Sequence, residues 1–225
     1  MSKEKPTGWT GPFKAEVVSD GTPTGRFAKI LFPKTKEEIE KFVFGRYAKA
    51  MNDRGTILAT IVQNDQNHFD FTVTLPDGSK HYIDLVEFVL HARCGSPYME
   101  AGGLISHKEA AEQLLETIRK KSDRYGKPGN TPIDLLVYTT HYRFLPSEPA
   151  VRLVQHSLQA SPPMMSSVQF LSFRDQDLVR PRMLYPVIGD PLEGHAPESF
   201  QDLKYMNFDP ANFDVVVKPD LPERS

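Results

Sequence analysis

The chain has 225 residues, of which 39% are hydrophobic and 25% are charged, and its formal net charge is −2. This composition is typical of one sizeable globular domain, and the charge gives no support to nucleic-acid binding through an overall basic surface. The single cysteine, Cys94, excludes an internal disulfide bond and a zinc site built from several cysteines.

No segment approaches the length of a membrane-spanning helix, and the N-terminal segment lacks the apolar region of a signal peptide. Together with the single cysteine, this predicts a soluble, cytoplasmic protein without a membrane partner. Proline gathers at both ends of the chain. We therefore expect an N-terminal extension of residues 1–34, an α/β core domain of residues 35–173, and a C-terminal extension of residues 174–225 that packs on the core.

The predicted core begins with a helix, after a short strand pattern at residues 26–32. Thr35 and Glu38 match a capping box, and apolar residues recur at helical spacing from about residue 36 to 52. Three strand patterns follow, at residues 56–62, 69–75 and 81–90. Pro76-Asp77-Gly78-Ser79 predicts a tight turn between the last two, so the three strands are expected to form a meander.

The second half of the core alternates helices and strands. Ser106 and Glu109 match a second capping box, for a helix that ends near Gly126. Residues 133–141 are a continuous apolar run, typical of a strand that is covered on both faces. A helix capped by Ser147 and a strand at residues 167–173 follow. The expected fold class is α/β, an αβββαβ core with a central mixed sheet flanked by helices. Beyond Arg174, only residues 213–217 have a strand pattern.

Three acids interrupt the meander strands: Asp70, Asp84 and Glu87. A charged side chain within a strand is costly unless it is solvated, paired or bound to a metal, so these acids are the best functional signal of the sequence. Strand alternation places Asp84 and Glu87 on opposite faces, so Asp70 and Asp84 can share one site while Glu87 points away. A structural interpretation is open as well: Asp70 caps the preceding turn, Asp84 faces solvent and Glu87 pairs with a lysine.

The order of elements from Thr35 to His141, with an acid at the start of the second strand and another in the third, resembles the PD-(D/E)XK nuclease superfamily, whose fold is called restriction-endonuclease-like. This resemblance implies a Mg²⁺-dependent phosphodiesterase or nuclease. It implies that Asp70 is the first metal ligand and Asp84 the second, or Glu87 if the register differs. Nucleic acid would then bind through a local site.

The chain departs from the family pattern at one position. In the family, a lysine stands two residues after the second acid and positions the attacking water. Val86 or Val89 occupies that position here. We expect Lys80, on the Asp84 face of the same strand, to be the relocated catalytic lysine, with Lys108 near the start of the second helix as the alternative.

The resemblance also allows Glu38 or Glu40 of the first helix to add a carboxylate to the site. Because the lysine is displaced, the alternative function is a catalytically silent member of the same fold, an interaction or regulatory module with a protein partner or a second copy of itself.

Other signals have simpler interpretations. Arg119, Lys120, Lys121, Arg124 and Lys127 gather at the end of the second helix. They either contact phosphate beside the site or, as we prefer, complement the helix dipole. His141 with Arg143, at the end of the apolar strand, is a second candidate site, and Cys94 is interpreted as an ordinary thiol.

Overall fold

The computed structural model describes residues 9–17, 23–64, 69–90, 104–125, 132–200 and 202–207, with backbone alone before residue 30. The helices that it describes are α1 (Lys36–Asn52), α2 (His107–Ser122) and α3 (Glu148–Ala160). The strands of the central sheet are β3 (Thr60–Gln63), β4 (Phe71–Thr74), β5 (Lys80–Glu87), β7 (Ile133–Tyr138), β8 (Ser167–Phe173) and β9 (Val179–Tyr185). Smaller elements are β1 (Trp9–Val17), β2 (Pro23–Ile30), β6 (Ile105–Ser106), β10 (Lys204–Tyr205) and 3-10 turns at Asp123–Tyr125, Tyr142–Phe144 and Pro197–Phe200.

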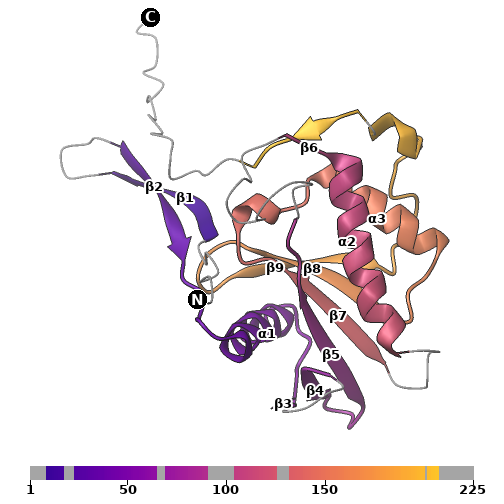
Figure 1. The fold of residues 1–225 in the computed structure, drawn as a ribbon. Coiled ribbons are helices and arrows are strands. Elements are labelled where there is room, and N and C mark those ends of the chain that lie inside the picture. Colours follow the sequence, from indigo (N-terminus) through magenta and orange to yellow (C-terminus); the bar gives the residue numbers. More distant parts are fainter. Residues whose placement is uncertain are drawn as a thin grey trace, which may run out of the picture.

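The central sheet has six strands in the order β3-β4-β5-β7-β8-β9. The first three form an antiparallel meander, β5, β7 and β8 run parallel, and β9 returns antiparallel at the edge. Two small antiparallel pairs, β1 with β2 and β6 with β10, lie outside this sheet (Figure 1). The prediction of an α/β fold with a mixed sheet is confirmed.

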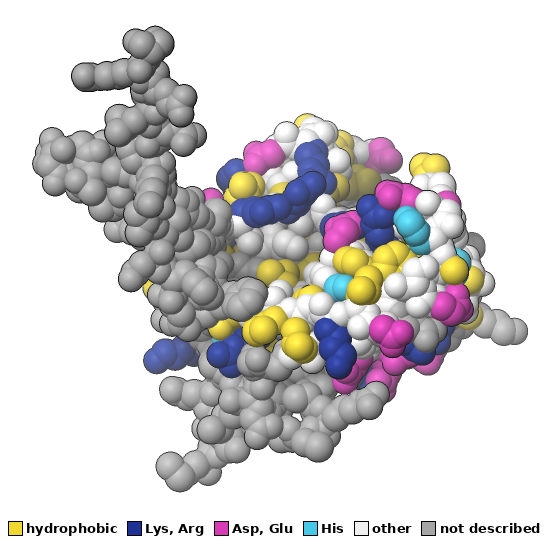
Figure 2. Space-filling model, turned by 90° about the horizontal axis from the view of Figure 1, so that it is seen from above, with side chains coloured by type: hydrophobic (Ala, Val, Ile, Leu, Met, Phe, Trp, Pro, Cys, Tyr) yellow, Lys and Arg dark blue, Asp and Glu magenta, His cyan; other side chains and the backbone are white. Residues whose placement is uncertain are grey.

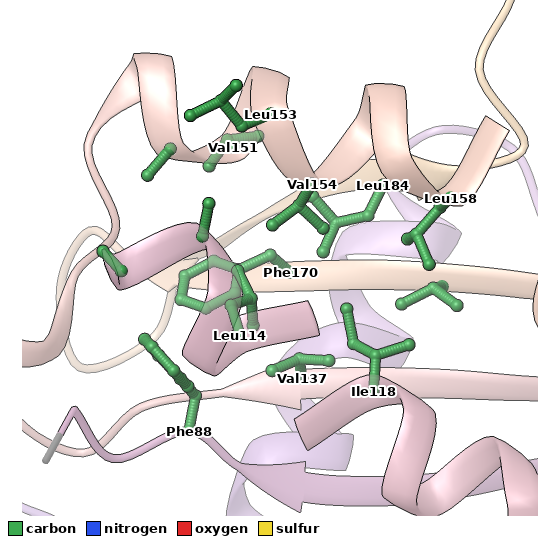
Figure 3. Close-up of a cluster of buried hydrophobic side chains, with 14 of the residues drawn as sticks. Phe88, Leu114, Ile118, Val137, Val151, Leu153, Val154, Leu158, Phe170 and Leu184 are labelled. Atoms are coloured by element: carbon green, nitrogen blue, oxygen red, sulfur yellow. The ribbon is translucent and has the colours of Figure 1, made fainter. Parts of the chain in front are cut away.

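Helices cover both faces of the sheet, with α1 on one side and α2 and α3 on the other (Figure 1). Strand alternation divides the core accordingly. In β7, Leu135 and Val137 pack toward α2 and α3, whereas Leu136 and Tyr138 pack toward α1. Figure 3 shows the first of these clusters, in which Leu114 is completely buried. Truncating such a leucine to alanine typically costs about 2–5 kcal/mol of stability.

The strongest local signals of the sequence correspond to observed elements. α1 spans residues 36–52, and its capping box is formed by Thr35 and Glu38. The predicted turn joins β4 to β5, where the Asp77 carboxylate accepts hydrogen bonds from the Ser79 N–H and hydroxyl at 2.9 and 2.6 Å. Gly78 has a φ of 83°, a conformation that glycine adopts without steric cost. The helix–meander arrangement is therefore encoded locally.

Several strands are shorter than predicted: β4 begins at Phe71 where residue 69 is expected, β5 ends at Glu87 where residue 90 is expected, and β7 ends at Tyr138 where residue 141 is expected. β3 begins at Thr60, later than the expected residue 56, because backbone and side-chain hydrogen bonds tie Thr56 and Leu58 back to the end of α1. The sequence does not predict β9, because Pro181 interrupts the strand pattern after Arg174. β9 is an edge strand, and a proline whose nitrogen faces the open edge removes no hydrogen bond between strands. The strand pattern at 213–217 and Cys94 lie outside the described residues. No helix in the described ranges is long and apolar enough to cross a bilayer.

Candidate functional site

Asp84 is a buried carboxylate in the middle of β5. Only 2% of the residue is exposed, so the interpretation in which it faces solvent is wrong. The residue points toward α2, whose Lys121 Nζ lies 3.0 and 2.9 Å from the two carboxylate oxygens. The Tyr125 hydroxyl donates a hydrogen bond to Oδ2 at 2.6 Å. These charged and neutral donors compensate the cost of burying the carboxylate.

Asp70 lies beside Asp84 because β4 begins only at Phe71, directly after Asp70. β4 and β5 are paired only as far as Phe71 and Ile83, whereas β5 continues to Glu87. The edge of β5 beyond this pair is open toward β4, and the Asp70 Oδ2 atom accepts the Leu85 N–H there at 2.6 Å. A side-chain carboxylate thus takes the place of a backbone ladder partner.

The two aspartates interact directly. Burial raises the pKa of Asp70 to about 7, with further contributions from a hydrogen bond and from the charge of Asp84. The Leu85 N–H opposes this shift. Two carboxyls thus lie against the single ammonium of Lys121, so the cluster favours an additional positive charge, either a proton or a metal cation.

Tyr125 is held in place by its ring as well as by its hydroxyl. It ends the 3-10 turn that follows α2, and its ring stacks on Phe69 with centroids 5.3 Å apart. Burial and the hydrogen bond to Asp84 raise the pKa of Tyr125 well above its ordinary value. The hydroxyl therefore stays protonated and acts as a donor at neutral pH.

A cavity of about 270 Å³ extends from α1 to α2 past the open edge of β5. Leu85 and Lys121 line it, whereas Asp70 and Asp84 lie behind them and are not part of the lining. Its lining includes the cations Lys36, Lys121 and Arg124 and the acids Glu40 and Glu87. Glu40 is buried and pairs with Lys36 at 3.3 Å. Because Lys121 pairs with Asp84, Arg124 is the cation of this lining that forms no ion pair within the described residues.

Glu87 lies on the opposite face of β5 from Asp84, as strand alternation predicts. It shares the α1 side with Ile83 and Leu85, and its carboxylate accepts a hydrogen bond from the Thr140 hydroxyl at 2.7 Å. In this register Glu87 does not join the pair of Asp70 and Asp84.

The two lysines expected from the sequence lie away from the aspartates. Lys80 pairs with Thr74 at the far end of β4 from Asp70, about 13 Å along β5 from Asp84 at the usual rise per residue. Lys108 lies in the first turn of α2 and pairs with Glu112 at 3.8 Å. The cation that reaches Asp84 is Lys121 instead, a member of the basic cluster at the end of α2, so this lysine does more than complement the helix dipole.

The periodicity of α2 contains a sequence signal that Lys121 and Tyr125 face the sheet. Leu114 and Ile118 are fully buried on the helix face that packs on the sheet. Lys121 and Tyr125 follow at the next positions of the same stripe, seven and eleven residues after Leu114. A lysine on an apolar stripe requires a buried anion, and Asp84 supplies it.

The other candidates have structural roles. Glu38 belongs to the capping box of α1, which leaves Glu40 as the α1 acid at the cavity. The His141 Nδ1 atom accepts the Arg143 N–H at 3.2 Å and begins a 3-10 turn. The Arg143 Nε atom donates to the Tyr142 hydroxyl at 3.0 Å. The pair of His141 and Arg143 is therefore part of a local turn.

Asp70 and Asp84 are the residues best placed to hold a metal ion. Within the described ranges, no group of three or more histidine, cysteine, aspartate or glutamate side chains forms a metal site. Two carboxylates suit Mg²⁺, which prefers hard oxygen ligands and commonly keeps water and substrate phosphate in its remaining positions. They do not suit a structural zinc site.

We compared the chain with models of known protein families, with curated proteins and with solved structures, and none of the three comparisons finds a match.

Proposed function

We propose that this protein is a metal-dependent phosphodiesterase, a nuclease of restriction-endonuclease-like fold. One observation carries the proposal: Asp70 and Asp84 lie together at the open edge of β5, with the Lys121 ammonium within 3.0 Å of Asp84. This arrangement supplies two acids that could hold a metal ion and one cation, Lys121, that lines the neighbouring cavity, and such groups can serve metal-assisted phosphodiester hydrolysis.

The order of elements supports this proposal. α1 precedes the meander β3-β4-β5, α2 follows, and β7 pairs parallel to β5. The first acid stands directly before β4 and the second lies in β5. These are the positions at which the superfamily that the sequence resembles has its metal ligands, and Lys121 supplies from α2 the positive charge that Val86 does not.

The residues fit a magnesium ion. Asp70 and Asp84 would hold it, since their oxygens are hard donors and their combined charge exceeds that of Lys121. When bound, the ion would neutralise the phosphate charge and lower the pKa of a coordinated water. Lys121 would offset the charge of Asp84 and orient a phosphate or water oxygen, while Tyr125 holds the same carboxylate in position.

The cavity supports an anionic substrate that binds locally. Lys36 and Arg124 line it together with Lys121; Lys36 pairs with Glu40 and Lys121 with Asp84, so Arg124 would be the first cationic partner of a phosphate oxygen. On the face shown in Figure 2, apolar, basic and acidic side chains are interspersed, and no single sign of charge dominates. Contact with nucleic acid would then occur locally, at the cavity.

A second candidate function has its own observation. Lys121 and Tyr125 together donate to both oxygens of Asp84, and no described buried side-chain polar atom lacks a hydrogen-bond partner. A fully compensated cluster needs no metal to be stable. This favours a catalytically silent member of the same fold that serves as an interaction or regulatory module.

Metal binding and cleavage distinguish these two functions. Mg²⁺ and Mn²⁺ are titrated calorimetrically into wild type, Asp70→Asn and Asp84→Asn, and each protein is assayed on single- and double-stranded DNA and RNA. The nuclease proposal predicts metal binding and cleavage by wild type, both lost in the two variants. Metal binding without cleavage would favour the silent module, and the absence of both would contradict the nuclease proposal.

A further inference from the structure

A second pocket lies between the C-terminal end of α1 and the turn that joins β8 to β9. Its volume is about 300 Å³, and three arginines line it: Arg54, Arg174 and Arg180. It shares no lining residue with the cavity that Lys121 lines. The two pockets are therefore separate sites on the chain.

The lining of this arginine pocket is predominantly cationic, and the carboxylates of Asp175 and Asp177 lie in the adjoining turn. None of its three arginines forms an ion pair within the described part of the chain. Asp53 is the acid of the lining, and its carboxylate accepts a hydrogen bond from Lys49 at 2.7 Å. The lining thus carries three positive charges against one acid that already has a cationic partner, and such a pocket attracts an anion.

The turn that supports the pocket is held in one conformation. The Asp175 carboxylate accepts hydrogen bonds from the N–H groups of Asp177 and Leu178, both at 2.8 Å. Arg46 of α1 donates to the Gln176 carbonyl at 2.8 Å and to Asp177 at 3.1 Å. Because these bonds fix the turn to α1, a ligand would bind without first ordering it, which lowers the entropic cost of binding.

We propose that the arginine pocket binds the phosphate groups of a small phosphorylated molecule. Guanidinium groups present paired N–H donors that match phosphate oxygens, and several guanidiniums around one opening suit a multiply charged anion. Ala50, Leu178 and Val179 add an apolar wall, and Leu178 is 44% exposed. The volume is at the lower end of the range for small-molecule sites, about 300 to 1,000 Å³.

The test is a calorimetric titration of the full chain with inorganic pyrophosphate, with citrate as a carboxylate anion and with a short single-stranded oligonucleotide. The test variant is Arg54→Gln/Arg174→Gln. The matched control is Arg119→Gln/Lys120→Gln, which removes two positive charges from exposed positions of α2. Thermal unfolding of each variant verifies that it is folded.

We expect pyrophosphate to bind wild type and the control variant equally. The test variant should bind it at least about tenfold more weakly, since each charge-assisted hydrogen bond contributes roughly that factor. Citrate should bind more weakly than pyrophosphate to wild type. The proposal is overturned if pyrophosphate does not bind, if the two variants bind it equally, if citrate binds as tightly, or if only the oligonucleotide binds.

Discussion

The Oδ2 atom of Asp70 accepts the backbone N–H of Leu85 at 2.6 Å, across the edge of β5 that β4 leaves open. This hydrogen bond places the Asp70 carboxyl beside Asp84, on the strand that also carries Leu85. The two acids lie together because the pairing of β4 with β5 ends at Phe71 and Ile83, and because the Asp70 side chain then bonds to β5. Lys121 and Tyr125 reach the pair from the end of α2.

The pair of acids predicts an unusual pH dependence of stability. The pKa of Asp70 is about 7 when folded and near 4 when unfolded, so the folded protein binds this proton more tightly. Between about pH 4 and pH 7 the unfolded chain releases the proton while the folded protein keeps it, and the free energy of unfolding therefore falls as pH rises through this window. Urea denaturation in EDTA should show this slope in wild type and a flatter profile in Asp70→Asn. An identical pH profile for the two proteins would contradict this assignment.

Lys121→Met should strongly destabilise the protein. It leaves the buried Asp84 carboxylate without its charged partner, which typically costs about 3–5 kcal/mol. Adding Asp84→Asn to the variant should restore part of the loss, because the buried charge is then removed as well. Lys120→Met is the control: Lys120 is exposed and pairs with Glu116, so its loss should change stability by less than about 1 kcal/mol. Equal effects in equilibrium urea denaturation would refute the buried ion pair.

Tyr125→Phe isolates the hydroxyl that donates to Asp84. The ring can keep its stack on Phe69, so the expected loss of stability is about 1–3 kcal/mol, the cost of one hydrogen bond to a charged group. Tyr82→Phe is a matched control, because Tyr82 also packs on Phe69, with ring centroids 4.7 Å apart. It should change the free energy of unfolding by less than about 0.5 kcal/mol. If the two variants unfold at the same urea concentration, the hydroxyl of Tyr125 has no stabilising role.

Glu87→Gln distinguishes the two possible second ligands. Glu87 lies on the α1 face of β5 and is held by Thr140, so its amide variant should bind Mg²⁺ about as tightly as wild type. Asp84→Asn should reduce the affinity by at least about tenfold, since Mg²⁺ binding depends on one or two carboxylates. Calorimetric titrations measure both. The opposite ranking would assign the ligand role to Glu87.

Local sequence patterns are sufficient to predict much of this fold. Helix α1, the turn at Gly78 and strand β8 follow from capping, turn chemistry and apolar periodicity, which act between residues close in sequence. Strand β9 is not predictable from the local pattern, because Pro181 lacks the backbone N–H donor of a strand residue. The sheet tolerates this proline because β9 lies at its edge.

The candidate site is predictable only in part, because its residues are far apart in the sequence and are brought together by packing. The faces of Asp84 and Glu87 follow from alternation along one strand. The partner of Asp84, however, is 37 residues further along the chain, and it is set by how α2 packs on the sheet. Lys80 is nearer in sequence, but the extended strand carries it away from the acids, whereas the buried stripe of α2 brings Lys121 to them.

The central claim is that Asp70, Asp84 and Lys121 form a metal-dependent phosphodiesterase site. The most direct measurement is the cleavage of single- and double-stranded DNA and RNA by wild type and by Asp84→Asn, each with Mg²⁺, with Mn²⁺ and with EDTA. We predict cleavage by wild type that requires the metal ion and is lost in Asp84→Asn. No cleavage of any substrate by wild type, or equal cleavage by the two proteins, would contradict the claim.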